Sequence, residues 1–445
     1  MKISVIGCGY LGAVHAATLA SFGHQVIGID NDQRKIDHLR RGFAPFYEAG
    51  LEPLIKEATA RGNLRFSDDF SALADAEVHF LCVGTPQSKT SNDADLTALL
   101  SAVESVHQYL RPGAVLVGKS TVPVGTAAAV AEAIAGTGAA LAWNPEFLRQ
   151  GSAVQDSLHP DRLIFGIEPG PQAAALQRVL DQVYAPLLEA EVPRLVTNLP
   201  TAELIKVAAN AFLALKLSYI NAVGEFCEAT GADVTELAEA LGLDERIGGK
   251  YLHAGAGFGG GCLPKDLRSF RAQAQRHGIE AIDELMSLVD GINADARYRI
   301  AEAARELCQD KLAGRRITIL GASFKPKTDD TRDSPALEVA MQLATQGAKV
   351  VVTDPEAVNQ AWLQYPQLRF ETECSTALQG AELVILMTEW DQYRSLDPSE
   401  VAGLVGRKVV LDGRNALDAE SWRASGWTYR AVGIARRAPL KLDVV

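Results

Sequence analysis

KISVIGCGYLGAVHAATLASFGHQVIGID, residues 2–30, is the stretch that decides the fold. Lys2–Ile6 predicts a short buried strand, residues 13–22 predict a helix, and Gln25–Ile29 predicts a second strand that ends at an acid. The turn after the first strand reads GxGxxG, which lets backbone approach a pyrophosphate. An acid 18 residues after its last glycine can bond the adenosine ribose. The segment therefore predicts an NAD site, the acid favouring NAD over NADP, formed by Gly7, Gly9, Tyr10, Leu11, Gly12 and Asp30.

Strands and helices continue to alternate, which predicts a parallel, doubly wound sheet. Ligands bind such sheets outside the carboxyl ends of the strands. Thr85 and Thr121 follow two predicted strands, so their hydroxyls are candidates for holding the nicotinamide ribose or a catalytic water, or are ordinary cap and turn residues. Glu146, in NPEFLRQG, is a candidate acid/base or water-orienting group, or a surface glutamate. The strands in question are Val78–Val83, Ala114–Gly118 and Ala140–Trp143.

A long helix is predicted at residues 201–230, TAELIKVAANAFLALKLSYINAVGEFCEAT. It is apolar on more than one face, which predicts burial between domains or subunits. Lys206 and Asn210 are four residues apart and share one face of it. A lysine in that setting pairs with an anion, extends to solvent, or loses its charge.

A second α/β unit echoes the first as a weak internal repeat. Arg316–Leu320 followed by Gly321 matches the first strand and its glycine, and Asp354 ends the next strand as Asp30 does. The second copy carries an inserted segment, FKPKTDDTRD, whose basic residues predict a phosphate site or form a solvated charged face: Lys325, Lys327 and Arg332. Because it lacks GxGxxG, we do not expect it to bind a dinucleotide as the first unit does.

At 445 residues the chain is too long for one ordinary core. We expect an α/β protein with two Rossmann-like, doubly wound parallel-sheet domains joined by a central helical domain. The expected boundaries are residues 1–198, 199–312 and 313–445.

A glycine-rich loop, YLHAGAGFGGGCLPKD, spans residues 251–266. Its glycine density prevents regular structure and lets backbone come very close to a ligand. Pro264 can open a helix from Lys265 onward. Cys262 would then lie at the positive end of that helix near a cation, which favours the thiolate; the alternative is a buried cysteine beside a flexible loop. Lys206 is a candidate for the cation that stabilises an oxyanion formed when such a thiolate adds to a carbonyl.

Composition excludes several classes of function. The net charge of −12 argues against nucleic acid or an anionic membrane as the main partner. Six scattered cysteines show no metal-like spacing and fit a reduced, cytosolic protein, with no signal peptide visible. We see no apolar run approaching the roughly 18–20 residues that span a bilayer.

The motifs together resemble the UDP-glucose/GDP-mannose dehydrogenase family. They occur in the family's order and cover essentially the whole chain: GCGYLG, VGTP, STVPVGT, NPEFLRQG, HPDRLIFG, the Lys206/Asn210 helix, GFGGGCLPKD and SFKPKTDDTRDSP. Within the family, RIGGKY at residues 246–251 looks more like the members that oxidise UDP-glucose than those that oxidise GDP-mannose. The chain departs from the common pattern at Gln150, Ala256 and Gly261.

The resemblance implies a cytosolic homodimer, paired through its central helices, that oxidises UDP-glucose to UDP-glucuronate in four electrons with two NAD⁺. Cys262 would form a thiohemiacetal and then a thioester with the sugar. Lys206 and Asn210 would stabilise the oxyanion, and Asp266 would activate or position water. Thr121 and Glu146 would handle the ordered water and the first proton transfers. No metal is implied.

The resemblance also assigns binding residues. The cofactor set adds Lys35, Thr85, Thr121, Glu146, Lys265 and Arg332 to the glycine-turn residues. The substrate set is Glu146, Phe147, Leu148, Lys206, Asn210, Arg246, Tyr251, Leu252, His253, Ala254, Gly255, Phe258, Gly259 and Lys325, with Arg246 reaching a neighbouring subunit's substrate. The first domain would bind NAD, the central one would dimerise and contribute catalytic groups, and the last would bind the UDP-sugar.

Three rival interpretations stay open. GDP-mannose 6-dehydrogenase, or another nucleotide-sugar 6-dehydrogenase, would use the same chemistry on a different sugar. A two-electron hydroxyacid dehydrogenase shares the domain plan but needs neither a nucleophilic cysteine nor a basic loop. An NAD-binding scaffold or redox sensor would leave the co-occurrence of Cys262, Lys206 and Asp266 unexplained.

Overall fold

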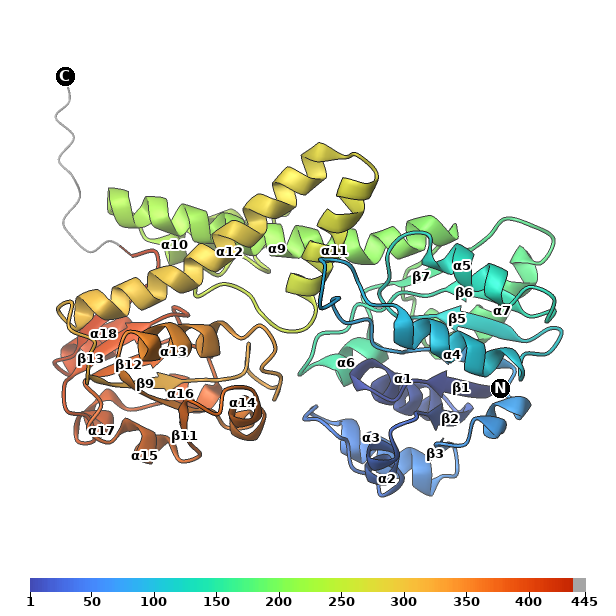
Figure 1. The fold of residues 1–445 in the computed structure, drawn as a ribbon, viewed down its shortest axis with the longest axis horizontal. Helices are drawn as coiled ribbons and strands as arrows, with labels where there is room; N and C mark the ends of the chain where they lie inside the picture. Colours follow the sequence, from blue (N-terminus) through green and yellow to red (C-terminus); the bar gives the residue numbers. More distant parts are fainter. Residues whose placement is uncertain (435–445) are drawn as a thin grey trace. The chain divides into compact units, whose positions relative to one another are not determined.

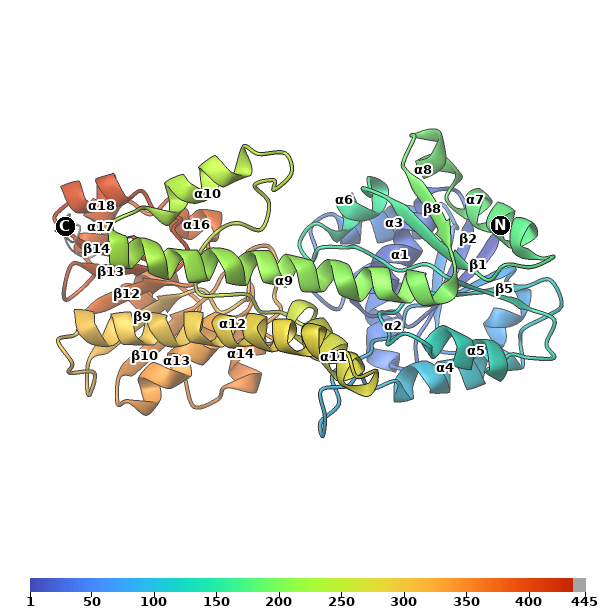
Figure 2. The ribbon, with the colours of Figure 1, turned by 90° about the horizontal axis from the view of Figure 1, so that it is seen from above.

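A computed structural model of the protein describes residues 1–434, so residues 435–445 of the expected last domain lie outside it. The chain divides into two compact units. Unit 1 comprises residues 1–209 with 268–277, and unit 2 comprises residues 210–267 with the chain from 278 onward. Figures 1 and 2 show a sheet flanked by helices in each unit.

Unit 1 is built on an eight-stranded sheet whose order is β3-β2-β1-β4-β5-β6-β7-β8. Alternate residues of its strands supply two hydrophobic clusters, with Val78 and Phe80 of β4 in one and Leu81 in the other, so both faces of the sheet are covered. The strands are β1 Lys2–Ile6, β2 Gln25–Ile29, β3 Leu64–Ser67, β4 Val78–Leu81, β5 Val115–Gly118, β6 Ala140–Trp143, β7 Leu163–Ile167 and β8 Arg194–Thr197.

Helices fill the connections of unit 1. They are α1 Tyr10–Ser21, α2 Gln33–Arg40, α3 Leu51–Ala60, the 3₁₀ turn η1 Phe70–Asp75, α4 Thr97–His107, α5 Thr126–Ala133, α6 Ala153–Leu158, α7 Ala173–Val183 and α8 Ala185–Glu189. The helix after the glycine turn thus begins at Tyr10, earlier than the predicted start at residue 13. Tyr10, Leu11 and Gly12 of the GxGxxG motif therefore lie in the first helical turn of α1.

The sheet of unit 1 is not wholly parallel. β6 pairs with β7 antiparallel, and β7 pairs with β8 parallel, so the last two strands run opposite to the other six. The connection from β6 to β7 contains only the six-residue helix α6, which packs on α1. An antiparallel partner does not need the long crossover helix that a parallel one does.

Helix α9, Leu199–Thr230, belongs to both units, which divide between Ala209 and Asn210. Asn198 accepts a hydrogen bond from the Thr201 amide at 2.9 Å at its start, and Gly231 follows its end at a φ of 89°. By length and composition alone it could cross a membrane, so the prediction that no such segment exists is wrong for α9. The sign is weak, because core helices of soluble proteins have the same composition, and 44% of its most apolar window is buried.

Unit 2 repeats the strand order of the first six strands of unit 1. Its six-stranded, all-parallel sheet has the order β11-β10-β9-β12-β13-β14. Leu383 and Ile385 of β12 lie in one hydrophobic cluster and Val384 and Leu386 in another, so this sheet too is covered on both faces. The strands are β9 Arg316–Leu320, β10 Lys349–Thr353, β11 Arg369–Glu371, β12 Leu383–Leu386, β13 Val409–Asp412 and β14 Thr428–Ala431.

The helices of unit 2 include α12, Glu280–Leu307, which lies beside the second half of α9 (Figure 2). The others are α10 Val234–Gly242, α13 Pro335–Thr345, α14 Val358–Gln364, α15 Cys374–Leu378, α16 Asp391–Arg394, α17 Pro398–Ala402 and α18 Ala419–Ala424. Helix α11, Leu263–Arg276, begins in unit 2 and continues into unit 1. The predicted fold class, two Rossmann-like sheets joined by a helical region, is confirmed.

The acid that ends the second strand is present in both copies but serves differently. Asp354 accepts hydrogen bonds from the Ala322 and Ser323 amides, from the Trp390 indole, and from two amides of its own turn. A side chain so fully bonded and buried has no site left for a ribose. This agrees with the expectation that the second unit does not bind a dinucleotide as the first does.

Candidate active site

The glycine turn of unit 1 has the geometry that a dinucleotide needs. Gly7 has a φ of +90°, which only glycine adopts readily. A side chain on Gly12 would overlap the Gly7 carbonyl, so this glycine lets α1 approach β1. A Cβ on Gly9 would meet nothing within 4 Å, which leaves open space beside the first turn of α1. The residues present therefore fit a pyrophosphate at the helix N-terminus.

Asp30 lies at the carboxyl end of β2, next to this turn. Its Oδ2 accepts a hydrogen bond from the Cys8 amide at 2.7 Å and pairs with the Lys35 ammonium at 2.8 Å. Its Oδ1 accepts from the Asp32 amide at 3.0 Å. The structure thus brings the predicted cofactor residues Asp30 and Lys35 together, and Asp30 also fixes the shape of the glycine turn.

Tyr10, predicted as a cofactor residue, has a structural task. Its hydroxyl bonds Glu48, and the Glu48 carboxylate accepts hydrogen bonds from the Gly151 amide at 2.6 Å and the Ala153 amide at 2.8 Å. Glu48 is buried and holds the segment after NPEFLRQ against α1. Sequence reasoning missed Glu48, because nothing in its local pattern distinguishes it from a surface acid. Leu11 packs against the core of unit 1.

The polar turns at the carboxyl ends of β4 and β5 are joined. The Thr85 hydroxyl donates to the Thr121 carbonyl at 2.6 Å, and the Ser120 hydroxyl donates to the Val83 carbonyl at 2.6 Å. The two predicted threonines therefore lie together, as expected from neighbouring strands.

Lys206 meets its anion in the same unit. Its ammonium lies 3.0 Å from Glu146 Oε1, and both side chains are almost buried. The other carboxylate oxygen of Glu146 accepts from the Leu148 amide at 2.5 Å, and the Phe147 ring lies 5.5 Å from the Lys206 ammonium. Of the three possibilities for a lysine on this helix, pairing with an anion is the one observed.

A second buried lysine, Lys119, was not predicted. It donates to the Asn144 side-chain oxygen at 2.9 Å, and the Tyr184 hydroxyl bonds the same oxygen at 2.5 Å. Burial lowers its pKa to about 8, with Cys82 and Glu146 opposing that shift and Lys206 adding to it. The lysine beside the STVP turn was the available signal, since lysine is rarely placed next to a buried strand.

Cys262 in unit 2 is exposed and outside any disulfide. Its carbonyl accepts a hydrogen bond from the Asp266 amide at 2.9 Å, so it stands at the start of α11, which begins at Leu263 rather than at Lys265. Buried Asp266 accepts from the Asn210 amide group at 2.6 Å and pairs with Lys265 at 2.6 Å. Unit 2 thus brings Asn210, Lys265 and Asp266 together beside the first turn after the cysteine.

The glycines before Cys262 make room for the protein's own chain. A side chain on Gly259 would overlap the Asp333 carbonyl, one on Gly260 would lie 2.8 Å from the Phe324 ring, and one on Gly261 would overlap the Arg332 guanidinium. The expectation that these glycines let backbone come very close to a ligand stays a prediction. The space at each is filled by the 324–333 segment, so the glycines allow two loops to pack against each other.

Four polar side chains, three of them buried and Arg414 half-buried, hold the loop in one conformation. The side-chain oxygen of Asn221 accepts a hydrogen bond from the Gly255 amide at 2.8 Å, and Arg414 donates to the Gly257 carbonyl at 2.9 Å. Two residues of α12 hold Phe258. The Asn293 side chain accepts a hydrogen bond from the Phe258 amide at 2.7 Å and donates one to the Phe258 carbonyl at 3.1 Å. Arg297 donates to the same carbonyl at 2.7 Å. The backbone at Gly255, Gly257 and Phe258 is therefore held by side chains from outside the loop. Sequence reasoning missed all four, which are distant from the loop along the chain.

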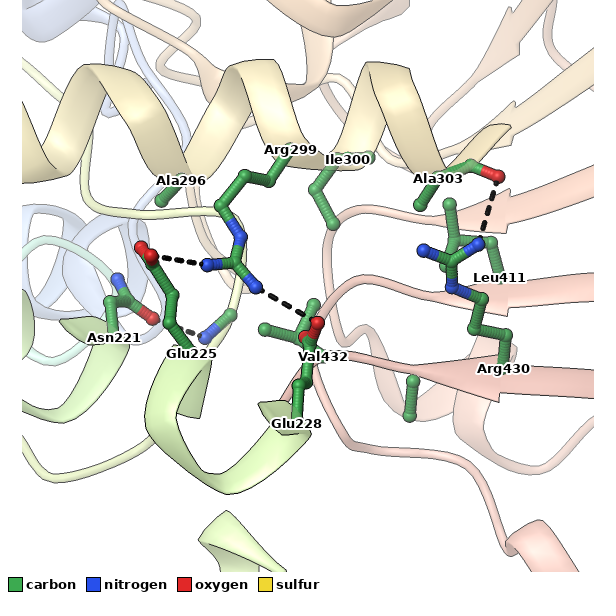
Figure 3. Close-up of a pocket in the computed structure, with 12 residues that line it drawn as sticks. Asn221, Glu225, Glu228, Ala296, Arg299, Ile300, Ala303, Leu411, Arg430 and Val432 are labelled. Atoms are coloured by element: carbon green, nitrogen blue, oxygen red, sulfur yellow. Dashed lines mark hydrogen bonds and ion pairs between the residues drawn. The ribbon is translucent and has the colours of Figure 1, made fainter. Parts of the chain in front are cut away.

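A small cavity beside this loop shows how α9 and α12 are joined (Figure 3). Arg299 of α12 lies between Glu225 and Glu228 of α9, at 2.7 and 2.9 Å, and Asn221 lies at the same wall. These ion pairs fix the two helices that supply Asn221 and Asn293 to the loop.

The other predicted substrate residues are either buried in unit 2 or at least partly exposed. Leu252 and Ala254 are buried in a hydrophobic cluster, and Phe258 is buried as well. Arg246 is 89% exposed and bonds Asp244 within its own turn, while the Lys325 ammonium lies 5.6 Å from the Phe324 ring. Tyr251, with a φ of 63°, opens the loop in a strained conformation, and His253 is exposed. Among residues 1–434 no cluster of three or more His, Cys, Asp or Glu could hold a metal ion.

A dinucleotide turn on one Rossmann-like sheet, and a second such sheet without that turn, define an NAD-dependent dehydrogenase with two α/β domains. Three stretches of the chain match known domains: residues 1–188 match the "UDP-glucose/GDP-mannose dehydrogenase family, NAD binding domain", 200–295 its central domain, and 318–419 its UDP binding domain. The chain belongs to the UDP-glucose/GDP-mannose dehydrogenase family.

Individual relatives agree over nearly the full length. The UDP-glucose 6-dehydrogenase of Rhizobium meliloti is 37% identical over 438 residues, which cover 97% of this chain and 99% of the relative. A UDP-glucose dehydrogenase structure from Pyrobaculum islandicum is 37% identical with a TM-score of 0.87, covering 98% of this chain and 97% of that one. The GDP-mannose dehydrogenase of Pseudomonas aeruginosa is 27% identical with a TM-score of 0.52, covering 97% and 99%.

Proposed function

We propose that this protein oxidises the primary alcohol of UDP-glucose to the carboxylate of UDP-glucuronate. The observation that carries the proposal is an exposed cysteine at a helix start, locked against a basic loop, in a chain with a dinucleotide turn. Identity to relatives named for UDP-glucose, at 37%, exceeds the 27% to the GDP-mannose dehydrogenase, which favours the UDP-sugar. A two-electron dehydrogenase would need no such cysteine.

The chemistry we propose is as follows. The C6 hydroxyl loses a proton and a hydride to give an aldehyde, with Thr121 and Glu146 handling the proton and an ordered water. The Cys262 thiolate adds to the aldehyde, and Lys206 and Asn210, one turn apart on α9, stabilise the oxyanion. Loss of a second hydride gives a thioester, and water directed by Asp266 cleaves the C–S bond to release the carboxylate. When bound, NAD⁺ supplies the hydride acceptor for both oxidations.

We further propose the residue assignments and the three domains given above for this chain. Residues 1–198 hold NAD through the glycine turn, Asp30, Lys35 and Thr85, with Lys265 and Arg332 contributing from the rest of the chain. Residues 199–312 carry the catalytic groups of α9 and the cysteine loop, and 313–445 hold the UDP end through Lys325. We infer that the enzyme works in the cytosol, without a nucleic-acid or membrane partner.

The stoichiometry of NADH production tests the proposed function. Purified protein given limiting UDP-glucose and excess NAD⁺ should yield two NADH per sugar, read at 340 nm. GDP-mannose and UDP-N-acetylhexosamines in parallel reactions serve as competing substrates. A yield of one NADH, or turnover only with GDP-mannose, would contradict it.

We also propose a homodimer paired through α9. Phe212, Tyr219 and Phe226 are exposed and seven residues apart, so they form one apolar stripe along that helix. Phe226→Asp should convert the dimer to a monomer in size-exclusion chromatography with light scattering. Trp362→Asp, at another exposed aromatic residue, on α14, should leave the mass unchanged. A native protein that runs as a monomer would refute the proposal.

A further inference from the structure

Arg332 is fixed directly against the backbone that precedes Cys262. Its guanidinium lies where a side chain on Gly261 would have to be. The Gly260 amide donates to the Arg332 carbonyl at 2.8 Å, which locks the cysteine loop and the 324–333 segment in register. The next residue, Asp333, has a φ of 45°, a strained value that persists only where the surroundings fix it, and Arg297 donates to its carbonyl.

Within the described part of the chain, the side-chain hydrogen bonds of Arg332 all go to Asp330 and use Nε and Nη2. Asp330 accepts hydrogen bonds from Nε, at 2.9 and 3.1 Å, and from Nη2 at 2.6 Å. Nη1 has no such bond among the described residues, and it lies with Cζ and Nη2 against Gly261. Asp330, together with the charge of Cys262, raises the pKa of Arg332, so the guanidinium stays charged.

The other charged groups beside Cys262 are paired as well. Lys265, on the first turn of α11, pairs with Asp266 at 2.6 Å, and Asp266 also accepts a bond from Asn210. Besides Asp330, Asp333 also lies near Arg332 and helps to raise its pKa. The N-terminus of α11 adds a partial positive charge at the cysteine.

We propose that Arg332 stabilises the thiolate of Cys262, and that it can do so because residue 261 has no side chain. The inference rests on the proposed function only in taking Cys262 as the nucleophile. It gives Arg332 a role in setting thiol reactivity before any cofactor binds. Gly261 becomes a positioning residue, since a side chain there would displace the guanidinium from the loop.

Alkylation of Cys262 tests this without substrate or cofactor. The full-length protein is treated with iodoacetamide from pH 5 to 10, and the Cys262 peptide is quantified by mass spectrometry. We expect Arg332→Gln to lower the rate at pH 7 by about three- to tenfold and to move the profile to higher pH, because a nearby cation changes the thiol pKa by up to about one unit at a surface. Gly261→Ala should shift it in the same direction, and Arg332→Lys should restore part of the rate.

Asp330→Asn should change the alkylation rate of Cys262 in the opposite direction. It removes the negative charge that partly neutralises Arg332, so we expect faster alkylation at pH 7. Arg369→Gln is the matched control, because Arg369 also binds an acid two residues away, Glu371, through Nε and Nη2. Cys374 is an internal reference, since burial raises its pKa to about 11. Thermal melts confirm that each variant is folded.

The outcomes separate this proposal from the proposed function. A native profile in Arg332→Gln would overturn the role of Arg332, and a native profile in Gly261→Ala would overturn that of Gly261. Slower alkylation in Asp330→Asn would show that the Arg332–Asp330 pair only maintains the structure, and it would also overturn the role of Arg332. Two NADH per UDP-glucose, measured separately, would still hold in any of these cases if the proposed function is right.

Discussion

Asn293→Ala removes the side chain that holds Phe258 from α12. Asn293 is buried, and its amide group bonds both the Phe258 amide, at 2.7 Å, and the Phe258 carbonyl, at 3.1 Å. In the variant the carbonyl keeps Arg297 at 2.7 Å, but the buried amide loses its partner. An orphaned buried donor costs about 1–3 kcal/mol, and the lost carbonyl bond about 1 kcal/mol more. We therefore expect the free energy of unfolding to fall by about 2–4 kcal/mol.

Urea denaturation followed by tryptophan fluorescence measures this change. Four of the five tryptophans lie in unit 2, so the signal reports the unit that contains the loop. Asn293→Asp should cost at least as much, because it keeps the acceptor for the amide but sets a carboxylate oxygen against the Phe258 carbonyl. Asn359→Ala removes the same side chain from an exposed site on α14 and should change stability by less than about 0.5 kcal/mol. If Asn293→Ala were as stable as that control, the account of how Asn293 holds the loop would be wrong.

Three further predictions follow from the site. Asp30→Ala should weaken NAD⁺ binding in calorimetry and leave UDP-glucose affinity near native; equal losses in both would argue against the ribose assignment. Cys262→Ser should block or greatly slow the second oxidation, so that a quenched reaction accumulates the two-electron product; turnover at the native rate would rule out the covalent route. Lys119, with a pKa lowered to about 8 against 10.5 when unfolded, binds fewer protons folded than unfolded between those pH values. The contribution of Lys119 to the unfolding free energy should therefore rise with pH across that window, by roughly 3 kcal/mol, and Lys119→Met should make the slope of unfolding free energy against pH less positive than in the native protein; equal slopes in both proteins would refute it.

The parts of the fold that local sequence determines were predictable. Lys2–Ile6, Gln25–Ile29 and Arg316–Leu320 are apolar runs bounded by glycine or an acid, and the strands have those bounds. Edge strands such as β8 and β11 were not predicted, because they are short and partly exposed and lack such a run. The reversed direction of β7 depends on its partner in the sheet, which its own residues do not encode.

The candidate site divides in the same way. Asp30, Glu146, Lys206 and Cys262 follow from motifs in which spacing carries the chemistry. Asn221, Asn293 and Arg414 do not, since each acts on a loop that is distant in sequence and is recognisable only once the fold places it there. The glycines show the limit of composition, because their density predicted close approach but could not say that the approaching group is the 324–333 segment.

The clamps on the cysteine loop have a consequence for the newly made chain. Gly257 is bonded by Arg414, 157 residues further on, and Gly260 by the carbonyl of Arg332. Contacts of such separation require both segments to be present and the intervening loop to close, which costs chain entropy. The thiol therefore acquires its surroundings only when the last α/β unit is complete, and a ribosome-bound or truncated chain carries an ordinary cysteine. Reactivity at this one position would then report what fraction of a preparation has finished folding.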